Sequence, residues 1–200
     1  MKKISFFIAA FFIGTALLAQ GRPAKFGLKA GVNISTLDIE NFNDDDARIG
    51  LHIGGLAHIH LGSTEQWALQ PELVYSQEGG KLNTPSGTTT VKLDYINIPV
   101  MLQYMFNNGF RIEAGPQLGL MVSSKYEADD VEEDADDEFE STNFSLGFGL
   151  SYLSDSGFGV GGRYNLGLSS IGEGPGDVKG RTLQLGLFYM FDSRHKAKSR

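Results

Sequence analysis

The sequence predicts an all-β protein, an eight-stranded antiparallel up-and-down transmembrane β-barrel. Three observations lead to this prediction. Apolar and polar residues alternate with a period of two along eight segments, short and long connections between these segments alternate strictly, and aromatic residues gather at one end of the segments. Period-two alternation is the pattern of strands that have one apolar face and one polar face.

The composition limits the class of protein. A chain of 200 residues is expected to form about one domain. The absence of cysteine excludes disulfide bonds and thiolate metal or redox chemistry. The 26 glycines and 14 phenylalanines make the chain too apolar and aromatic for disorder. The net charge of −7 argues against a nucleic-acid partner, which would require a basic surface.

The N-terminal residues have the pattern of a signal peptide. Lys2 and Lys3 precede an uncharged apolar run at 4–18, and small residues around Ala19 offer a cleavage site. The alternative is a membrane anchor, but a run of about 15 residues is shorter than the roughly 20 that a spanning helix needs. We therefore expect a signal peptide at 1–19, an exported barrel domain at 20–191 and a basic C-terminal tail at 192–200.

Each predicted strand alternates in the same way. In the first, Phe26, Leu28 and Ala30 share one face, while Gly27 and Lys29 share the other. A strand of about 11 residues, at about 3.3 Å per residue and tilted by about 40°, spans roughly the thickness of an outer-membrane apolar band. The predicted strands are 26–34, 49–61, 67–76, 96–106, 110–122, 144–152, 158–168 and 182–191.

The connections are of two kinds. The short ones are 62–66, 107–109 and 154–157, which contain the Gly, Asn, Asp and Ser residues of tight turns. The long polar ones are 35–47, 77–91, 123–142 and 170–180. Short periplasmic turns that alternate with long external loops are typical of outer-membrane barrels.

The apolar face could meet lipid, or it could line the core of a soluble, lipocalin-like barrel. The aromatic residues favour a lipid-facing apolar face. They lie on this face at the end with the short turns, as in a belt at a membrane–water boundary. This predicted periplasmic aromatic belt consists of Phe26, Trp67, Tyr104, Phe106, Phe110, Tyr152, Phe158, Tyr189 and Phe191.

The opposite face carries many glycines and a few charges of both signs. Such residues suit the narrow lumen of an eight-stranded barrel, which side chains just fill. We interpret the charges as a structural ion-pair network that plugs the lumen, since buried charges must be paired; a gated ion path is the alternative. The predicted network consists of Lys29, Glu72, Arg111, Glu113 and Arg163.

Four stretches together resemble the PorT-like outer-membrane β-barrel family of Bacteroidetes-type bacteria: Phe26–Ser35, Leu69–Gln77, Tyr95–Val100 and Ala114–Gln117. The resemblance covers essentially all of the mature chain. It implies an outer-membrane barrel in a Gram-negative bacterium, and it implies little about activity. The chain departs from barrels that finish on a terminal aromatic residue, which the assembly machinery reads, because the basic tail follows Phe191.

Other candidate sites have simpler interpretations. His52, His58 and His60 share one strand face, and two of them could hold a metal if a third ligand converged. We expect ordinary lumen or rim histidines, with no metal and no cofactor. The ten carboxylates within 127–140 lack the spacing of an EF-hand, so we expect a solvated loop. Loose divalent-cation binding, bridging to lipopolysaccharide, is the alternative for this loop.

No catalytic grouping or phosphate-binding glycine loop is found, so the sequence predicts a protein that is not an enzyme. We expect a structural or surface-interaction barrel, with outer-membrane lipid and lipopolysaccharide as its surroundings. One alternative is an accessory component of a secretion or envelope-assembly machine with an envelope protein partner. The other is a small, porin-like solute pore.

Overall fold

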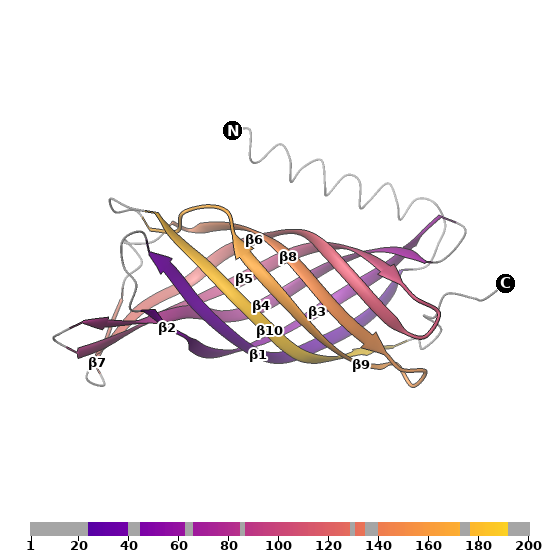
Figure 1. Ribbon diagram of the computed structural model, residues 1–200, viewed down its shortest axis with the longest axis horizontal. Helices are drawn as coiled ribbons and strands as arrows, with labels where there is room; N and C mark the ends of the chain where they lie inside the picture. The colour runs from indigo at the N-terminus through magenta and orange to yellow at the C-terminus, as the bar shows by residue number, and fades with distance from the viewer. Residues whose placement is uncertain are drawn as a thin grey trace.

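The computed structural model describes residues 24–39, 45–62, 66–84, 87–128, 131–134, 140–172 and 177–191. The expected signal peptide and basic tail lie outside these residues. Eight long antiparallel strands form the barrel: β1 (Lys25–Ile39), β3 (Arg48–Leu61), β4 (Trp67–Thr84), β5 (Gly87–Met105), β6 (Phe110–Ala128), β8 (Thr142–Leu153), β9 (Phe158–Gly167) and β10 (Val178–Met190). Two short strands, β2 (Asp45–Asp46) and β7 (Val131–Asp134), pair with β4 and β6 (Figure 1).

The sheet closes on itself. Around the ring the order is β4, β3, β1, β10, β9, β8, β6 and β5, and β5 pairs with β4 again. The first and last strands pair from Gly27 opposite Met190 to Ile39 opposite Val178. Closure is required in hydrocarbon, where each unpaired backbone N–H or C=O group costs several kcal/mol. The predicted eight-stranded up-and-down barrel is confirmed.

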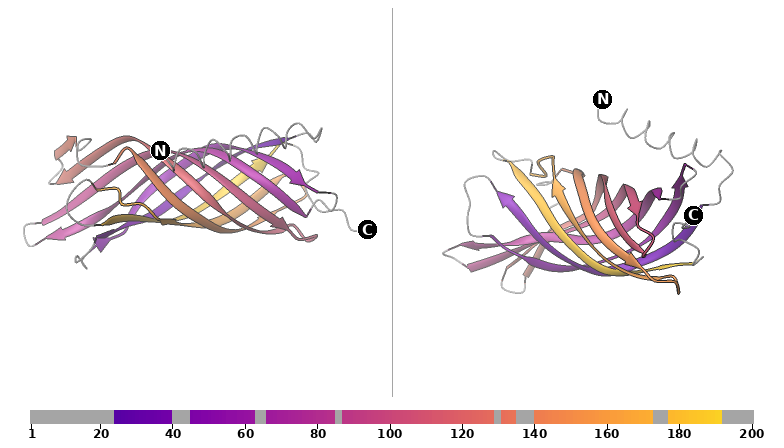
Figure 2. Two further views of the ribbon diagram at one scale, coloured as in Figure 1. Left: turned by 90° about the horizontal axis from the view of Figure 1, so that it is seen from above. Right: turned by 45° about the vertical axis from the view of Figure 1, so that its right-hand side comes forward.

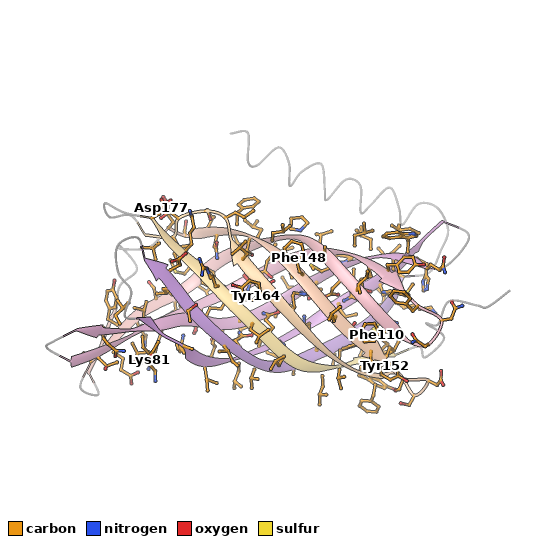
Figure 3. The ribbon with its side chains drawn as sticks, viewed as in Figure 1. Lys81, Phe110, Phe148, Tyr152, Tyr164 and Asp177 are labelled. Carbon is orange, nitrogen blue, oxygen red and sulfur yellow. The ribbon has the colours of Figure 1, made fainter. Side chains whose placement is uncertain are left out.

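The two faces of the wall differ as predicted. Outward leucines such as Leu28 and Leu187 are 56% and 63% exposed, whereas Glu72 and Arg163 are 4% and 5% exposed. A soluble barrel would have the reverse arrangement. Figure 3 shows Phe110 and Tyr152 together near one end of the barrel, and Lys81 and Asp177 near the other. We call these the short-turn end and the long-connection end.

The tight turns lie where the sequence predicts them. Gly109 and Gly157 have φ angles of 90° and 89° in the hairpins between β5 and β6 and between β8 and β9. Glycine adopts this left-handed conformation without a steric penalty. The backbone oxygens of these two glycines accept hydrogen bonds from Leu153 N and Met190 N, both at 2.9 Å, so each turn is tied to a neighbouring strand.

The expected long loops are wrong in large part, because strands continue through them. β4 and β5 stay paired until Thr84 opposite Gly87, and β6 continues to Ala128, where it pairs with β7. Strand therefore replaces most of the predicted loop at 77–91 and the beginning of the predicted loop at 123–142. Within the acidic segment, strand covers residues 127–128 and 131–134. Figure 2 shows these magenta to pink strands reaching past the rest of the barrel at one end.

The reason for this error is a change of pattern within one strand. In β5 the inward positions Val91, Leu93 and Tyr95 are apolar or aromatic and buried, while the next inward position, Asn97, is polar. The outward positions change in the opposite sense at the same point, from Asp94 to Ile96. The geometric alternation is unbroken in β5, but the apolar face switches from inside to outside between Asp94 and Asn97. Because the predicted strands are defined by one continuous apolar face, the predicted strand begins only at residue 96.

Candidate functional site

Four of the five predicted lumen charges meet at the centre of the barrel. They come from four strands: Lys29 from β1, Glu72 from β4, Glu113 from β6 and Arg163 from β9. Lys29 Nζ lies 2.9 Å from Glu72 Oε2, and Arg163 Nη2 lies 2.6 Å from Glu72 Oε1. Arg163 Nε donates to Glu113 Oε1 at 2.7 Å. Arg163 thus lies between two carboxylates that are contributed by different strands.

This network is neutral and well supplied with hydrogen bonds. Two cations face two carboxylates, and the remaining carboxylate capacity is used by amides. Gln70 Nε2 donates to Glu72 Oε1 at 2.9 Å, and Gln103 Nε2 donates to Glu113 Oε2 at 2.7 Å. Buried ion pairs are tolerated only when such partners offset the loss of hydration. The sequence did not single out the two glutamines, although both lie on the predicted polar face.

The fifth predicted member, Arg111, interacts with the charge of Glu113 but makes no ion pair or hydrogen bond with the other four among the described residues. Its side chain is 2% exposed, and its Nη1 atom has no hydrogen-bond partner among the described residues. Gln103 Oε1 is likewise buried without a partner in the described part of the chain. Arg111 lies one layer closer to the short-turn end, on β6, where its cross-strand partners are Met105 and Ser151.

A row of glycines makes room for the side chains in the lumen. Gly31 is opposite Gly186, which is opposite Gly161, so three adjacent strands have no side chain at this level. The ring of His52 occupies the vacated space: a Cβ atom on Gly31 would lie 2.8 Å from His52 Cε1. His52 Nδ1 lies 2.8 Å from Asn33 Oδ1. The predicted lumen histidine is therefore part of a polar layer next to the charge network.

A second buried carboxylate layer was missed from the sequence. Glu78 is 7% exposed and accepts hydrogen bonds from Ser76 Oγ and Asn97 Nδ2, both at 2.8 Å, and from Thr182 Oγ1 at 3.1 Å. The sequence predicts a loop at 77–91, and such a loop gives Glu78 no inward position. Glu78 follows Glu72 by six residues, an even number, so continued alternation would place both side chains on the inner face.

Apolar side chains form a buried cluster at each end of the lumen. At the long-connection end, Ile171 folds into the mouth of the barrel with a side chain that is 1% exposed. The cluster there consists of Leu37, Val91, Leu93, Tyr95 and Ile171. At the short-turn end, the cluster consists of Leu56, Leu153 and Met190, with Phe188 packed against them. The sequence does not predict these inward apolar residues, because the predicted inner face holds only glycine and polar side chains.

Two small cavities border the buried lumen side chains. A cavity of about 50 Å³ lies against Lys29, Glu72, Glu113 and Arg163. A second one, of about 10 Å³, lies beside Glu78 and Ile171. A buried water requires about 10–15 Å³ of such space, so the first cavity has room for a few waters at most.

The predicted belt residues lie on the outer face at the short-turn end, and most of them touch a neighbouring belt residue. The ring centroids of Trp67 and Tyr104 are 5.0 Å apart, and those of Tyr104 and Phe106 are 5.1 Å apart. On the other side of the barrel, the ring centroid of Tyr189 lies 4.7 Å from that of Phe158 and 5.8 Å from that of Phe191. Edge-on and tilted contacts at these distances are favourable aromatic arrangements.

His58 and His60 are the other two histidines of the predicted strand face. His58 and His60 have ring centroids 4.7 Å apart in an edge-to-face arrangement. Within the described ranges, no group of three or more His, Cys, Asp or Glu side chains could hold a metal ion. The same residues contain no helix long and apolar enough to cross a membrane.

The sequence comparison identifies the family. A model of the outer membrane protein beta-barrel domain matches residues 18–173. The chain belongs to this family. Its location is therefore the outer membrane of a Gram-negative bacterium, as predicted. No curated protein matches the sequence.

Solved structures of small outer-membrane barrels share the fold of this family member. The neisserial surface protein NspA is 17% identical, with a TM-score of 0.55. Ail, the attachment invasion locus protein of Yersinia pestis, is 15% identical, with a TM-score of 0.50. Each comparison covers 85% of this chain and 100% of the other chain. At these identities the likeness extends to the fold alone.

Proposed function

We propose that this barrel is a non-enzymatic integral outer-membrane protein with a plugged lumen, which acts as a structural scaffold and presents a surface outside the membrane. The arrangement of Arg163 between Glu72 and Glu113 is the main support, because it joins opposite walls of the barrel with hydrogen bonds of 2.6–2.9 Å. Buried apolar clusters lie above and below it, toward the two ends of the barrel. A side-chain-filled cylinder suits a scaffold better than a passage.

The surface that we assign to interactions is the extension of β4, β5 and β6 beyond the barrel. Short strands flank this extension, since β2 pairs with β4 and β7 pairs with β6. A continuous paired ribbon presents side chains in fixed positions, whereas a flexible loop must lose entropy on binding. We also propose that the chain is a PorT-like member of its family, with a cleaved signal peptide at 1–19. In this proposal the aromatic belt lies at the periplasmic boundary of the membrane.

Permeation measurements test the plugged lumen directly. The mature protein would be refolded into liposomes, and entry of small sugars and of monovalent ions would be recorded by swelling and by planar-bilayer conductance. We expect rates equal to those of protein-free liposomes. Steady conductance in folded, heat-modifiable protein would overturn the plug and favour the pore.

A further inference from the structure

The outer face carries a large apolar hollow on β1, β3, β4 and β10. Its volume is about 710 Å³. Ala30 is at its centre, and the cross-strand partners of Ala30 are the larger residues Ile53 and Leu187, which are 62% and 63% exposed. The small side chain therefore leaves a depression with aliphatic walls. Val32, Leu51 and Leu185 continue these walls.

This hollow runs into a charged pocket toward the long-connection end. Tyr75 and Gln77 line the hollow, and Gln77 also lines a second pocket of about 280 Å³. Tyr75 Oη donates to Asp94 Oδ2 at 2.7 Å, and Asp94 belongs to the second pocket. The other residues of this pocket are Arg48, Lys92, Ser123 and Lys125. Three cations thus lie directly beyond the apolar surface.

Two irregularities of the backbone bring cations to this face. The register of β5 and β6 shifts between Asp94 and Tyr95, so a bulge in β6 moves Lys125 to the outer face, where strict alternation would have turned it inward. Gly79, with a φ of 129°, leaves the outer face of β4 bare. Arg48 Nη1 lies beside this position, 3.4 Å from where a Cβ atom on Gly79 would be, and donates to the backbone oxygen of Glu78.

The cations are also placed close to each other. Lys92 and Lys125 are direct cross-strand partners, an arrangement that is destabilising for like charges unless an anion lies nearby. Glu127 is one such anion, since its Oε2 lies 2.8 Å from Lys92 Nζ. Together with Arg48, the two lysines form a cationic cluster at the rim of the apolar band. Arginine and lysine in such clusters are the usual partners of phosphate groups.

We propose that the hollow and the charged pocket together bind a phosphate-bearing glycolipid of the outer leaflet, such as lipid A. An acyl chain occupies the hollow around Ala30, and a phosphate group binds Arg48, Lys92 and Lys125. The charged pocket lies at the long-connection end, which faces outward in outer-membrane barrels. The apolar hollow and the cationic pocket follow one another along the barrel, as the acyl chains and the phosphate groups do along the lipid. This continuity, with the charge complementarity, selects an amphiphile over a free anion.

Titration calorimetry on the refolded mature barrel in uncharged detergent tests this site. The probes are bisphosphorylated lipid A, dephosphorylated lipid A and phosphatidylglycerol. We expect bisphosphorylated lipid A to bind most tightly. Lys92→Gln/Lys125→Gln is expected to weaken this binding about tenfold or more, since hydrogen bonds to charged groups are lost. Ala30→Leu is expected to weaken it by filling the hollow.

Matched variants separate the site from general effects. Lys179→Gln/Arg181→Gln removes the same charge and also breaks two ion pairs at the long-connection end, those with Asp177 and Asp38. Ala114→Leu makes the same apolar change on β6, on the opposite side of the ring from β1. Both controls should bind like the wild type. If the double lysine variant is not heat-modifiable and so has not folded, Arg48→Gln replaces it.

Three results would overturn the proposal. The first is equal binding by the lysine variant and its control, which would remove the role of the cationic pocket. The second is equal binding by Ala30→Leu and Ala114→Leu, which would remove the role of the hollow. The third is equal affinity for dephosphorylated lipid A or for phosphatidylglycerol, which would exclude a phosphorylated glycolipid as the specific occupant. None of these results depends on whether the lumen conducts.

Discussion

Arg163 and Glu72 are 91 positions apart in the sequence, yet they form a two-pronged ion pair across the lumen. Arg163 Nη1 donates to Glu72 Oε2 at 2.9 Å, and Nη2 donates to Oε1 at 2.6 Å. β9 and β4 lie opposite each other in the ring, so this contact connects walls that share no backbone hydrogen bonds. Paired, bidentate geometry of this kind is both strong and directional.

Removing the arginine should destabilise the barrel strongly. Arg163→Met leaves Glu72 and Glu113 buried without their shared cation, and a broken buried pair of this kind costs about 3–5 kcal/mol. Unfolding by urea in detergent, followed by fluorescence of the single tryptophan, Trp67, measures the change. Arg181→Gln is the control, because its ion pair with Asp38 is about half exposed. It should cost less than about 1 kcal/mol, and similar losses in both variants would contradict a stabilising network.

The glycine row predicts a site that tolerates no side chain. In Gly31→Ala the new methyl group would overlap the backbone oxygen of Leu185 and crowd the His52 ring. Overpacking of this kind costs about 1–3 kcal/mol, and we expect a lower urea midpoint and a smaller heat-modifiable fraction on gels. Gly180→Ala is the matched control, since nothing lies within 4 Å of its added Cβ. A normal midpoint for Gly31→Ala would show that the wall can widen at this level.

Closure of the long-connection end should depend on Ile171. Ile171→Ala removes a buried side chain that contacts Leu93 and its neighbours in the apolar cluster. The expected loss is about 2 kcal/mol or more, from lost burial and the cavity left behind. Ile49→Ala, at a residue 74% exposed on the outer face, should change stability less in the same detergent. We expect the urea midpoint of Ile171→Ala to be lower than that of Ile49→Ala. The reverse order would show that Ile171 is dispensable for closure.

The aromatic belt predicts a shallow position for Trp67 in the bilayer. Because Trp67 is the only tryptophan, its quenching by lipids brominated at different depths reports its position alone. We expect the strongest quenching from bromines near the headgroup, where aromatic belts lie. Trp67→Phe/Phe148→Trp moves the reporter along the outer face, toward the middle of β8, and deeper bromines should then be most effective. Strongest quenching of Trp67 at mid-chain would contradict the belt.

By itself, the sequence determined the positions of the eight strands and, over the predicted spans, the direction in which their side chains point. These properties are local, because successive side chains in a strand alternate between faces whatever the neighbouring strands are. For the same reason the sequence placed Lys29, Glu72, Arg111, Glu113 and Arg163 on the inner face.

Only the tertiary structure decided which of these residues meet. Partners across the lumen are set by the register and tilt of strands far apart in the chain, which period-two alternation does not encode. Arg111 therefore makes no direct ion pair or hydrogen bond with the four other charges, while Gln70 and Gln103 donate hydrogen bonds to the two carboxylates. The strand extensions were hidden for a related reason: outside the membrane the solvent is water on the outer side, so the apolar residues turn inward and the pattern inverts.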